Sequence, residues 1–148
     1  MEKTARSFFT KAQKEAIKQA ILNAELDTSG EIRVHIENVC EGEVLDRAAY
    51  IFDKLKINQT ALRNGVLFYL AVKNRKFAVI GDKGINEVVP DDFWEDLKNK
   101  MLNHFREGRF TEGLVEGITI TSRFLKKHFP YQTDDVNELP DDISFGSQ

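Results

Sequence analysis

Residues 63–84, RNGVLFYLAVKNRKFAVIGDKG, decide the fold of this chain. The stretch 66–72 is apolar or aromatic at every position, which is typical of a central strand covered by helices on both faces. A short polar segment, 73–76, separates it from a second apolar run, 77–80. Two such runs joined by a polar turn predict a β-hairpin whose second strand ends at Gly81.

The segments around this hairpin alternate between helical and strand patterns. Thr10 and Gln13 have the spacing of a capping box, so a helix is expected over about 10–26. Residues 31–39 alternate apolar and polar side chains, as in a strand with one buried face, and His35 is expected to face solvent. Further helices are expected over 43–56, from Pro90 to about 105, and from Thr111, taken as the cap of the last one. The order predicts an α/β fold, a mixed sheet with helices on both faces.

Length and charge indicate one domain followed by an acidic tail. The chain of 148 residues is the size of a single domain, which we place at 1–129, with a tail at 130–148. The tail carries five acidic residues and no Lys or Arg, and without them the net charge of −3 becomes about +2. A nucleic-acid-binding protein would normally show a concentrated basic stripe, so that class is not expected. Four apolar residues are spaced along the tail, at Val136, Leu139, Ile143 and Phe145. This pattern fits either a segment that docks on the domain or a disordered one.

Cys40 is the single cysteine, so an internal disulfide and a thiolate zinc cluster are excluded. No run reaches the roughly 20 apolar residues that a membrane helix needs, and the first residues lack a signal-peptide core. We therefore expect a cytoplasmic monomer that binds neither membrane nor nucleic acid. A protein partner remains possible.

The predicted topology gathers three turns at one edge of the sheet. A crossover helix makes the first two strands parallel, and the hairpin reverses the third. The starts of the first two strands, at Glu31 and Asn64, should then lie beside the end of the third, at Asp82. Such turns supply the oxygen ligands that calcium prefers. Equally, Asp82 and Asn64 could simply shape turns, and Asp91 and Asp92 could cap a helix.

Four stretches resemble the TPM domain family in their order and spacing. They are TSGEIRV (28–34), RNGVLFYLAV (63–72), VIGDKGI (79–85) and FREGRFTEGLVEGI (105–118), and the resemblance covers about 8–128. This family includes thylakoid-lumen proteins linked to photosystem II repair and many bacterial proteins. The tail stretch NELPDDISF (137–145) resembles that of a soluble bacterial branch. The resemblance implies a three-layer α/β/α sandwich, with acid phosphatase activity in some members and divalent-cation binding in others.

By matching motif, the resemblance implies metal ligands at Glu31, Asn64 and Asp82, to which proximity adds Asp91 and Asp92. We expect a cation-binding accessory or interaction domain, with calcium favoured and magnesium possible. The alternatives are a metal-dependent acid phosphatase that uses the same acidic edge and an interaction domain without metal. Arg63 stands where family members often carry aspartate, and a cation there would weaken a metal site or change its ligands.

Overall fold

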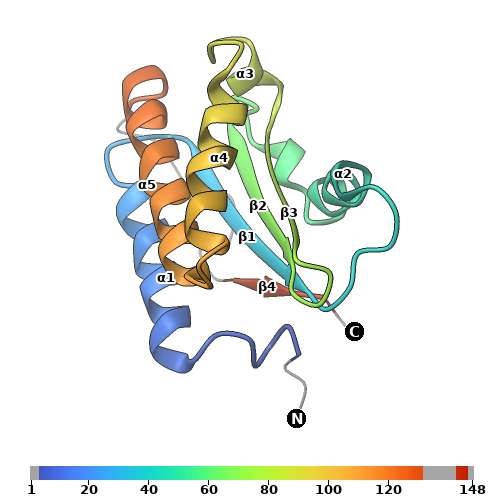
Figure 1. Cartoon of the computed structure of the whole chain (residues 1–148). Coiled ribbons are helices and arrows are strands. Elements are labelled where there is room, and N and C mark those ends of the chain that lie inside the picture. The colour runs from blue at the N-terminus through green and yellow to red at the C-terminus, as the bar shows by residue number, and fades with distance from the viewer. Residues whose placement is uncertain (1–3, 132–142, 147–148) are drawn as a thin grey trace.

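The computed structural model describes residues 4–131 and 143–146 of the chain. In chain order its elements are α1 (Lys11–Ala24), β1 (Glu31–Glu37), α2 (Val44–Lys54), a 3-10 helix η1 (Ile57–Gln59), β2 (Gly65–Ala71), β3 (Lys76–Gly81), α3 (Lys83–Asn86), α4 (Phe93–Phe105), α5 (Phe110–His128) and β4 (Ser144–Phe145). Helices α1, α4 and α5 cover one face of the sheet, and α2 lies on the other (Figure 1). The expected α/β fold with helices on both faces is confirmed.

The four strands form a mixed sheet in the order β3-β2-β1-β4. Strand β1 is parallel to both β2 and β4, and β3 is antiparallel to β2. Glu31 pairs with Gly65, and Val66 pairs with Gly81. The starts of β1 and β2 and the end of β3 therefore meet at one edge of the sheet, as the sequence predicts.

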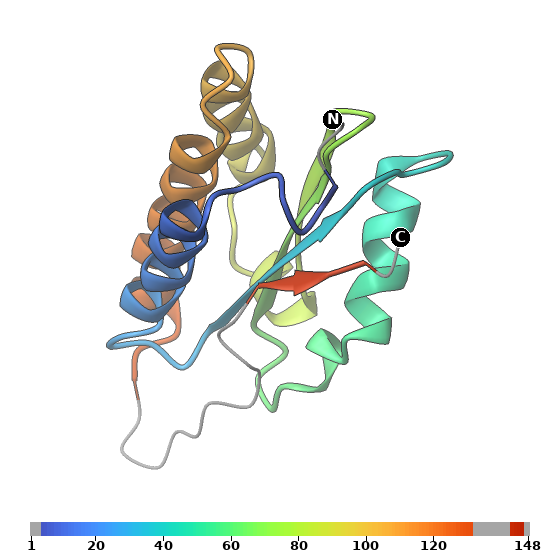
Figure 2. The same ribbon diagram turned by 90° about the horizontal axis from the view of Figure 1, so that it is seen from below.

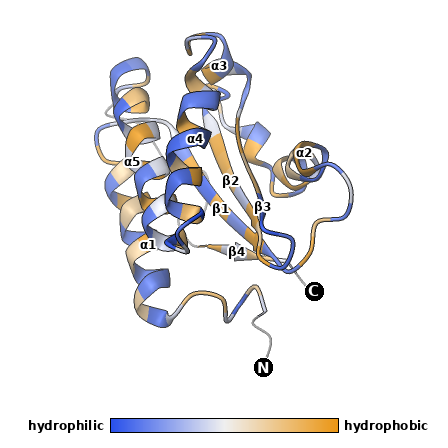
Figure 3. Ribbon diagram, in the orientation of Figure 1, coloured by the Kyte–Doolittle hydropathy of each residue, from blue (hydrophilic) through white to orange (hydrophobic). Residues whose placement is uncertain are grey.

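Strand β2 joins two apolar cores, and all seven of its residues are buried. Its residues Val66, Phe68 and Leu70 belong to the larger core beneath α1, α4 and α5, and the alternate side chains face α2. Figure 3 shows the same arrangement, with hydrophobic colouring along β2. Burying one large apolar side chain contributes about 1.5–3 kcal/mol, so this strand anchors both layers.

The two predicted helix caps have different outcomes. The capping box at α1 is present: Gln13 N donates to Thr10 Oγ1 at 3.1 Å, and Thr10 N donates to Gln13 Oε1 at 2.8 Å. Thr111, in contrast, is not a cap, because α5 begins one residue earlier and Arg109 occupies the N-cap position. The turn after α4, with Gly108 at φ +77°, already sets the direction of the next helix before Thr111 is reached.

Strand β4 and the short helices η1 and α3 were not predicted. Ser144 pairs with His35 and Phe145 with Ile36, and Gly146 N donates to Ile36 O at 2.9 Å. Figure 2 shows this short strand beside β1, on the side away from β2. Ile143 is buried in the larger core. Of the two interpretations of the tail, docking therefore holds for 143–146, whereas Val136 and Leu139 lie outside the described residues.

Candidate functional site

The edge shared by β1, β2 and β3 brings together three of the predicted site residues, Glu31, Asn64 and Asp82. Glu31 N donates to Asn64 O at 3.3 Å, and Asp82 N donates to Gly65 O at 2.9 Å. All three residues are buried, with exposed fractions of 2–6%. Backbone pairing thus fixes the spacing of these side chains, so none of them depends on a free loop for its position.

The Asp82 carboxylate is fully engaged with donors from two turns. Arg63 Nε donates to Asp82 Oδ2 at 2.8 Å, and Arg63 Nη2 donates to Asp82 Oδ1 at 2.9 Å. Lys83 N donates to the same Oδ1 at 2.7 Å, which makes Asp82 the N-cap of α3. The hydrogen bonds from Arg63 and the charge of Asp82 raise the pKa of Arg63. The edge thus already holds one cation, the guanidinium of Arg63.

The two members of this pair differ in their access to water. The Asp82 side chain is 5% exposed, whereas that of Arg63 is 47% exposed. Arg63 also has a left-handed backbone with φ 52°, which the tight turn before β2 imposes. Gly84 N donates to Arg63 O at 2.9 Å, so the turn after β3 packs directly on the turn that contains Arg63. The carboxylate is fixed by its surroundings, and the guanidinium is the partner that can turn away into solvent.

Asn64 connects the edge to the start of β1. Its Nδ2 donates to Ser29 Oγ at 3.3 Å, and its backbone N donates to Thr60 Oγ1 at 3.2 Å. The Asn64 side chain thus contacts Ser29, in the turn before β1. An open depression of about 460 Å³ between α2 and β3 leads to the Asp82–Arg63 pair, with Tyr50 and Ile80 among its lining residues.

Asp91 and Asp92 lie in the exposed turn that leads into α4. Asp92 is the N-cap residue of α4, but its side chain makes no capping hydrogen bond. Within the described ranges, no hydrogen bond links either carboxylate to Asp82 or Asn64. Nor do the described residues include a group of three or more His, Cys, Asp or Glu side chains that could hold a metal ion. As it stands, the edge is closed by Arg63 and is not a preformed metal cage.

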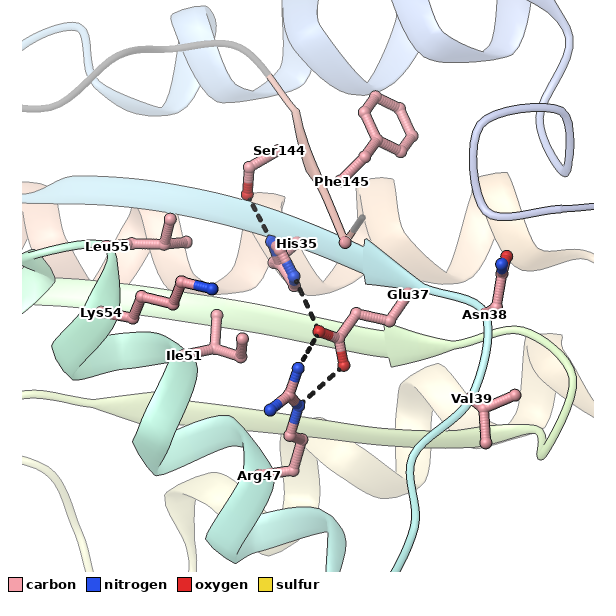
Figure 4. Close-up of a pocket in the computed structure, with 11 residues that line it drawn as sticks. His35, Glu37, Asn38, Val39, Arg47, Ile51, Lys54, Leu55, Ser144 and Phe145 are labelled. Atoms are coloured by element: carbon pink, nitrogen blue, oxygen red, sulfur yellow. Dashed lines mark hydrogen bonds and ion pairs between the residues drawn. The ribbon is translucent and has the colours of Figure 1, made fainter. Parts of the chain in front are cut away.

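A second polar cluster, at the opposite end of β1, was missed by the sequence reasoning. Glu37 accepts hydrogen bonds from Arg47 Nε at 3.0 Å and Arg47 Nη2 at 2.5 Å (Figure 4). It also accepts one from Tyr69 Oη at 2.5 Å. His35 Nε2 lies 3.3 Å from Glu37 Oε1, and His35 Nδ1 lies 2.7 Å from Ser144 Oγ. We call His35, Glu37, Arg47 and Tyr69 the Glu37 network.

The expectation that His35 faces solvent is wrong, because its residue exposure is 4%. It shares a face of β1 with Glu37, and α2 and β4 cover that end of the strand. A signal was present in the sequence: Glu31, Arg33, His35 and Glu37 alternate along one strand face, with both charge signs. Charged side chains on a strand face that other elements cover need hydrogen-bonded partners, which favours a paired polar cluster over separate solvated side chains.

Burial and pairing shift the pKa values within the Glu37 network in directions that have clear causes. Burial lowers the pKa of His35 and outweighs its hydrogen bond to Glu37, which favours the imidazolium. Burial also opposes ionisation of Glu37, but the hydrogen bonds from Arg47 and Tyr69 lower its pKa overall. For Tyr69, burial and the Glu37 carboxylate both raise the pKa. At neutral pH the network thus contains an Arg47–Glu37 ion pair and two neutral partners.

The profile of the TPM domain family matches residues 4–123. The chain belongs to this family. It is 49% identical to the BA42 protein of the psychrophilic bacterium Bizionia argentinensis, whose solution structure superposes with a TM-score of 0.87 over 94% of this chain and 96% of that one. The family and the sandwich implied by the resemblance are therefore confirmed.

More distant solved structures share the fold alone. The N-terminal domain of a P. gingivalis protein is 21% identical, with a TM-score of 0.69 over 84% of this chain and 83% of that one. The N-terminal domain of cg2496 from Corynebacterium glutamicum is 11% identical, with a TM-score of 0.65 over 88% and 81%. Among curated proteins, none matches the chain. In the part of this TPM domain that the structure describes, no helix has the length and apolar character needed to cross a membrane.

Proposed function

We propose that this TPM domain is a binding module without strong catalytic activity, and that its β1–β2–β3 edge takes up one divalent cation, calcium in preference to magnesium. The observation that carries the proposal is the Asp82–Arg63 pair. A buried carboxylate has its charge balanced by a side chain that is half exposed. A cation could replace the guanidinium without moving the backbone.

The ligand chemistry favours calcium over magnesium. Calcium accepts six to eight oxygen ligands in a flexible arrangement and combines carboxylate, amide, hydroxyl, carbonyl and water oxygens. Magnesium requires a near-ideal octahedron at shorter distances. At this edge Asp82 would provide the charged ligand, with Asn64, Ser29 and water completing the shell and Glu31 close by at the start of β1. With a single central carboxylate, the affinity should be weak.

Because Arg63 already balances Asp82, the same edge is poorly suited to phosphomonoester hydrolysis. That reaction needs an activated nucleophile or a metal-bound water together with groups that neutralise phosphoryl charge. Two-metal sites that do this chemistry use several carboxylates in register, whereas Asp91 and Asp92 lie outside the hydrogen-bonded edge. We therefore infer binding in preference to acid phosphatase activity.

The test is a calcium and magnesium titration of the ¹⁵N-labelled chain, followed by backbone amide shifts, with p-nitrophenyl phosphate hydrolysis assayed at acidic pH. We expect saturable calcium shifts confined to residues 29–31, 63–65 and 81–84 at millimolar concentration, and no turnover. Asp82→Asn should abolish these shifts, while Asp92→Asn, the matched control, should retain them. Absence of shifts in the wild type would refute the proposal, and turnover lost in Asp82→Asn would establish the phosphatase instead.

A further inference from the structure

The sheet has a topological switch point at β1, because later strands are added on both of its sides. The chain passes from β1 to β2 and β3 on one side and then returns to place β4 on the other side of β1. The β1–β2 connection runs through α2, and the connection to β4 follows α4 and α5 on the opposite face (Figure 1). In open α/β sheets, ligands bind outside the carboxyl ends of the strands at such a switch point. This rule selects the end of β1, remote from the Asp82 edge.

A pocket of about 200 Å³ lies at that position, between the end of β1, helix α2 and strand β4 (Figure 4). Its volume corresponds to about seven water molecules at roughly 30 Å³ each. That space suits a small molecule. Ile51 and Leu55 of α2 and Phe145 of β4 supply apolar surface, and His35, Glu37 and Arg47 supply polar surface.

The charge of the pocket is decided by which groups are already paired. Glu37 accepts two hydrogen bonds from Arg47 and one from Tyr69, and it contacts His35 Nε2, so its acceptor positions are filled by protein donors. Glu37 is also the one acidic side chain among the described lining residues. Its charge is balanced by Arg47, and the pocket therefore has no free negative charge.

Lys54 supplies the remaining charge. Its ammonium lies 5.9 Å from the Tyr50 ring centroid and forms no ion pair with any residue in the described ranges. Figure 4 shows its amine extending toward His35, above Ile51. Arg47 uses Nε and Nη2 for Glu37, which leaves further guanidinium N–H donors. The pocket thus combines one unpaired cation, spare donors and an apolar wall.

We propose that this pocket binds a small organic carboxylate. The anionic group would contact Lys54 and the spare N–H groups of Arg47, and a short apolar body would lie against Ile51 and Leu55. A monoanion matches the single unpaired ammonium. A phosphate dianion would bring a second negative charge close to Glu37. This inference does not rest on cation binding at Asp82, which lies at the other end of the sheet.

Strand β4 forms one wall of the pocket, so ligand binding should also stabilise the pairing of β4 with β1. This strand pairs with β1 at two positions, and Ser144 Oγ is held by His35 Nδ1. A ligand that requires this wall binds the docked form alone and therefore increases its population. The Gly146 amide, which donates to Ile36 O, reports on docking through its hydrogen exchange rate.

The experiment is an amide-shift titration of the full chain with sodium pentanoate at constant ionic strength. We expect saturable shifts at residues 37–39, 51–55 and 144–146, and slower exchange of the Gly146 amide. Pentanamide, the neutral analogue, should give no saturable shift. Lys54→Gln should weaken pentanoate binding about tenfold, the loss of one charge-assisted hydrogen bond. Lys98→Gln, an exposed lysine on α4 across the sheet, should leave the affinity unchanged.

Four results would overturn the proposal. Three concern pentanoate: no saturable shift in the millimolar range, equal binding of pentanamide, and an unchanged affinity in Lys54→Gln whose own spectrum shows a folded chain. Inorganic phosphate serves as the competing anion. If it binds here as tightly as pentanoate, the pocket is a general anion site and the assignment to carboxylates is wrong.

Discussion

Replacing Glu37 by glutamine removes the one charge around which the Glu37 network is built. The substitution keeps the size of the side chain and changes one carboxylate oxygen into an NH₂ donor. Arg47 then faces a donor where it had an acceptor, and its two-pronged interaction with Glu37 cannot form. The glutamine oxygen can accept from Tyr69 or from Arg47, but it no longer carries a charge.

The size of the effect follows from the burial of Glu37 and from the hydrogen bonds that the glutamine cannot make. A hydrogen bond to a charged group contributes about 1.5–3 kcal/mol, and removing one partner of a buried ion pair costs about 3–5 kcal/mol. The Glu37 side chain is 6% exposed, but that of Arg47 is 37% exposed and its guanidinium can regain water. We therefore expect Glu37→Gln to lower the free energy of unfolding by about 2 kcal/mol, below the full cost of a buried pair.

Urea unfolding followed by Trp94 fluorescence and far-UV circular dichroism measures this change. The exposed Glu41→Gln, four residues along the chain, is the matched control and should shift the free energy of unfolding by less than about 0.5 kcal/mol. Tyr69→Phe should cost about 1 kcal/mol, and its combination with Glu37→Gln should cost less than the sum, because both substitutions act on the same hydrogen bond between Tyr69 and residue 37. A Glu37→Gln stability equal to that of the control would refute the reasoning.

Three further substitutions test separate parts of the fold. Burial lowers the pKa of His35 in the folded chain, so the unfolded chain binds more protons as the pH drops from about 7 to 5. The free energy of unfolding should therefore fall over this range, and His35→Gln should flatten the dependence in urea midpoints measured across pH. In Gly84→Ala the new Cβ would lie 2.2 Å from Leu62 O, a backbone atom, and thermal unfolding should show a loss of about 1–3 kcal/mol. Thr10→Ala removes the capping box of α1 and should cost about 1 kcal/mol in the same assay, whereas unchanged stability would show that the cap is unimportant.

Local patterns predicted most of the fold because they reflect local physics. The capping box at Thr10 and the fully apolar strand β2 each depend on neighbouring residues, and their spacing is visible in the sequence. Strand β4 could not be found in this way. Two residues are too few to show alternation, and the strand exists because Ser144 and Phe145 pair with a segment more than 100 residues away.

The position of the candidate site could be predicted from the sequence, but the ion pair between Asp82 and Arg63 could not. Strand order alone brings Asn64 and Asp82 to one edge. That Arg63 closes the edge depends on its left-handed backbone and on the packing of Gly84 against the same turn, and neither can be seen in residue types. The Glu37 network could not be predicted because the alternation over 31–39 is typical of a strand with one buried and one solvated face, whereas α2 and β4 cover the polar side of β1 at its carboxyl end.

The calcium affinity of Arg63→Gln, compared with that of the wild type by amide-shift titration, tests the central claim most directly. If the guanidinium occupies the place of the cation, removing its charge should tighten calcium binding at residues 63–65 and 81–84. Arg63→Lys, which keeps the charge, should bind more weakly than Arg63→Gln. A calcium affinity in Arg63→Gln equal to or weaker than that of the wild type would contradict the exchange of Arg63 for a cation at Asp82.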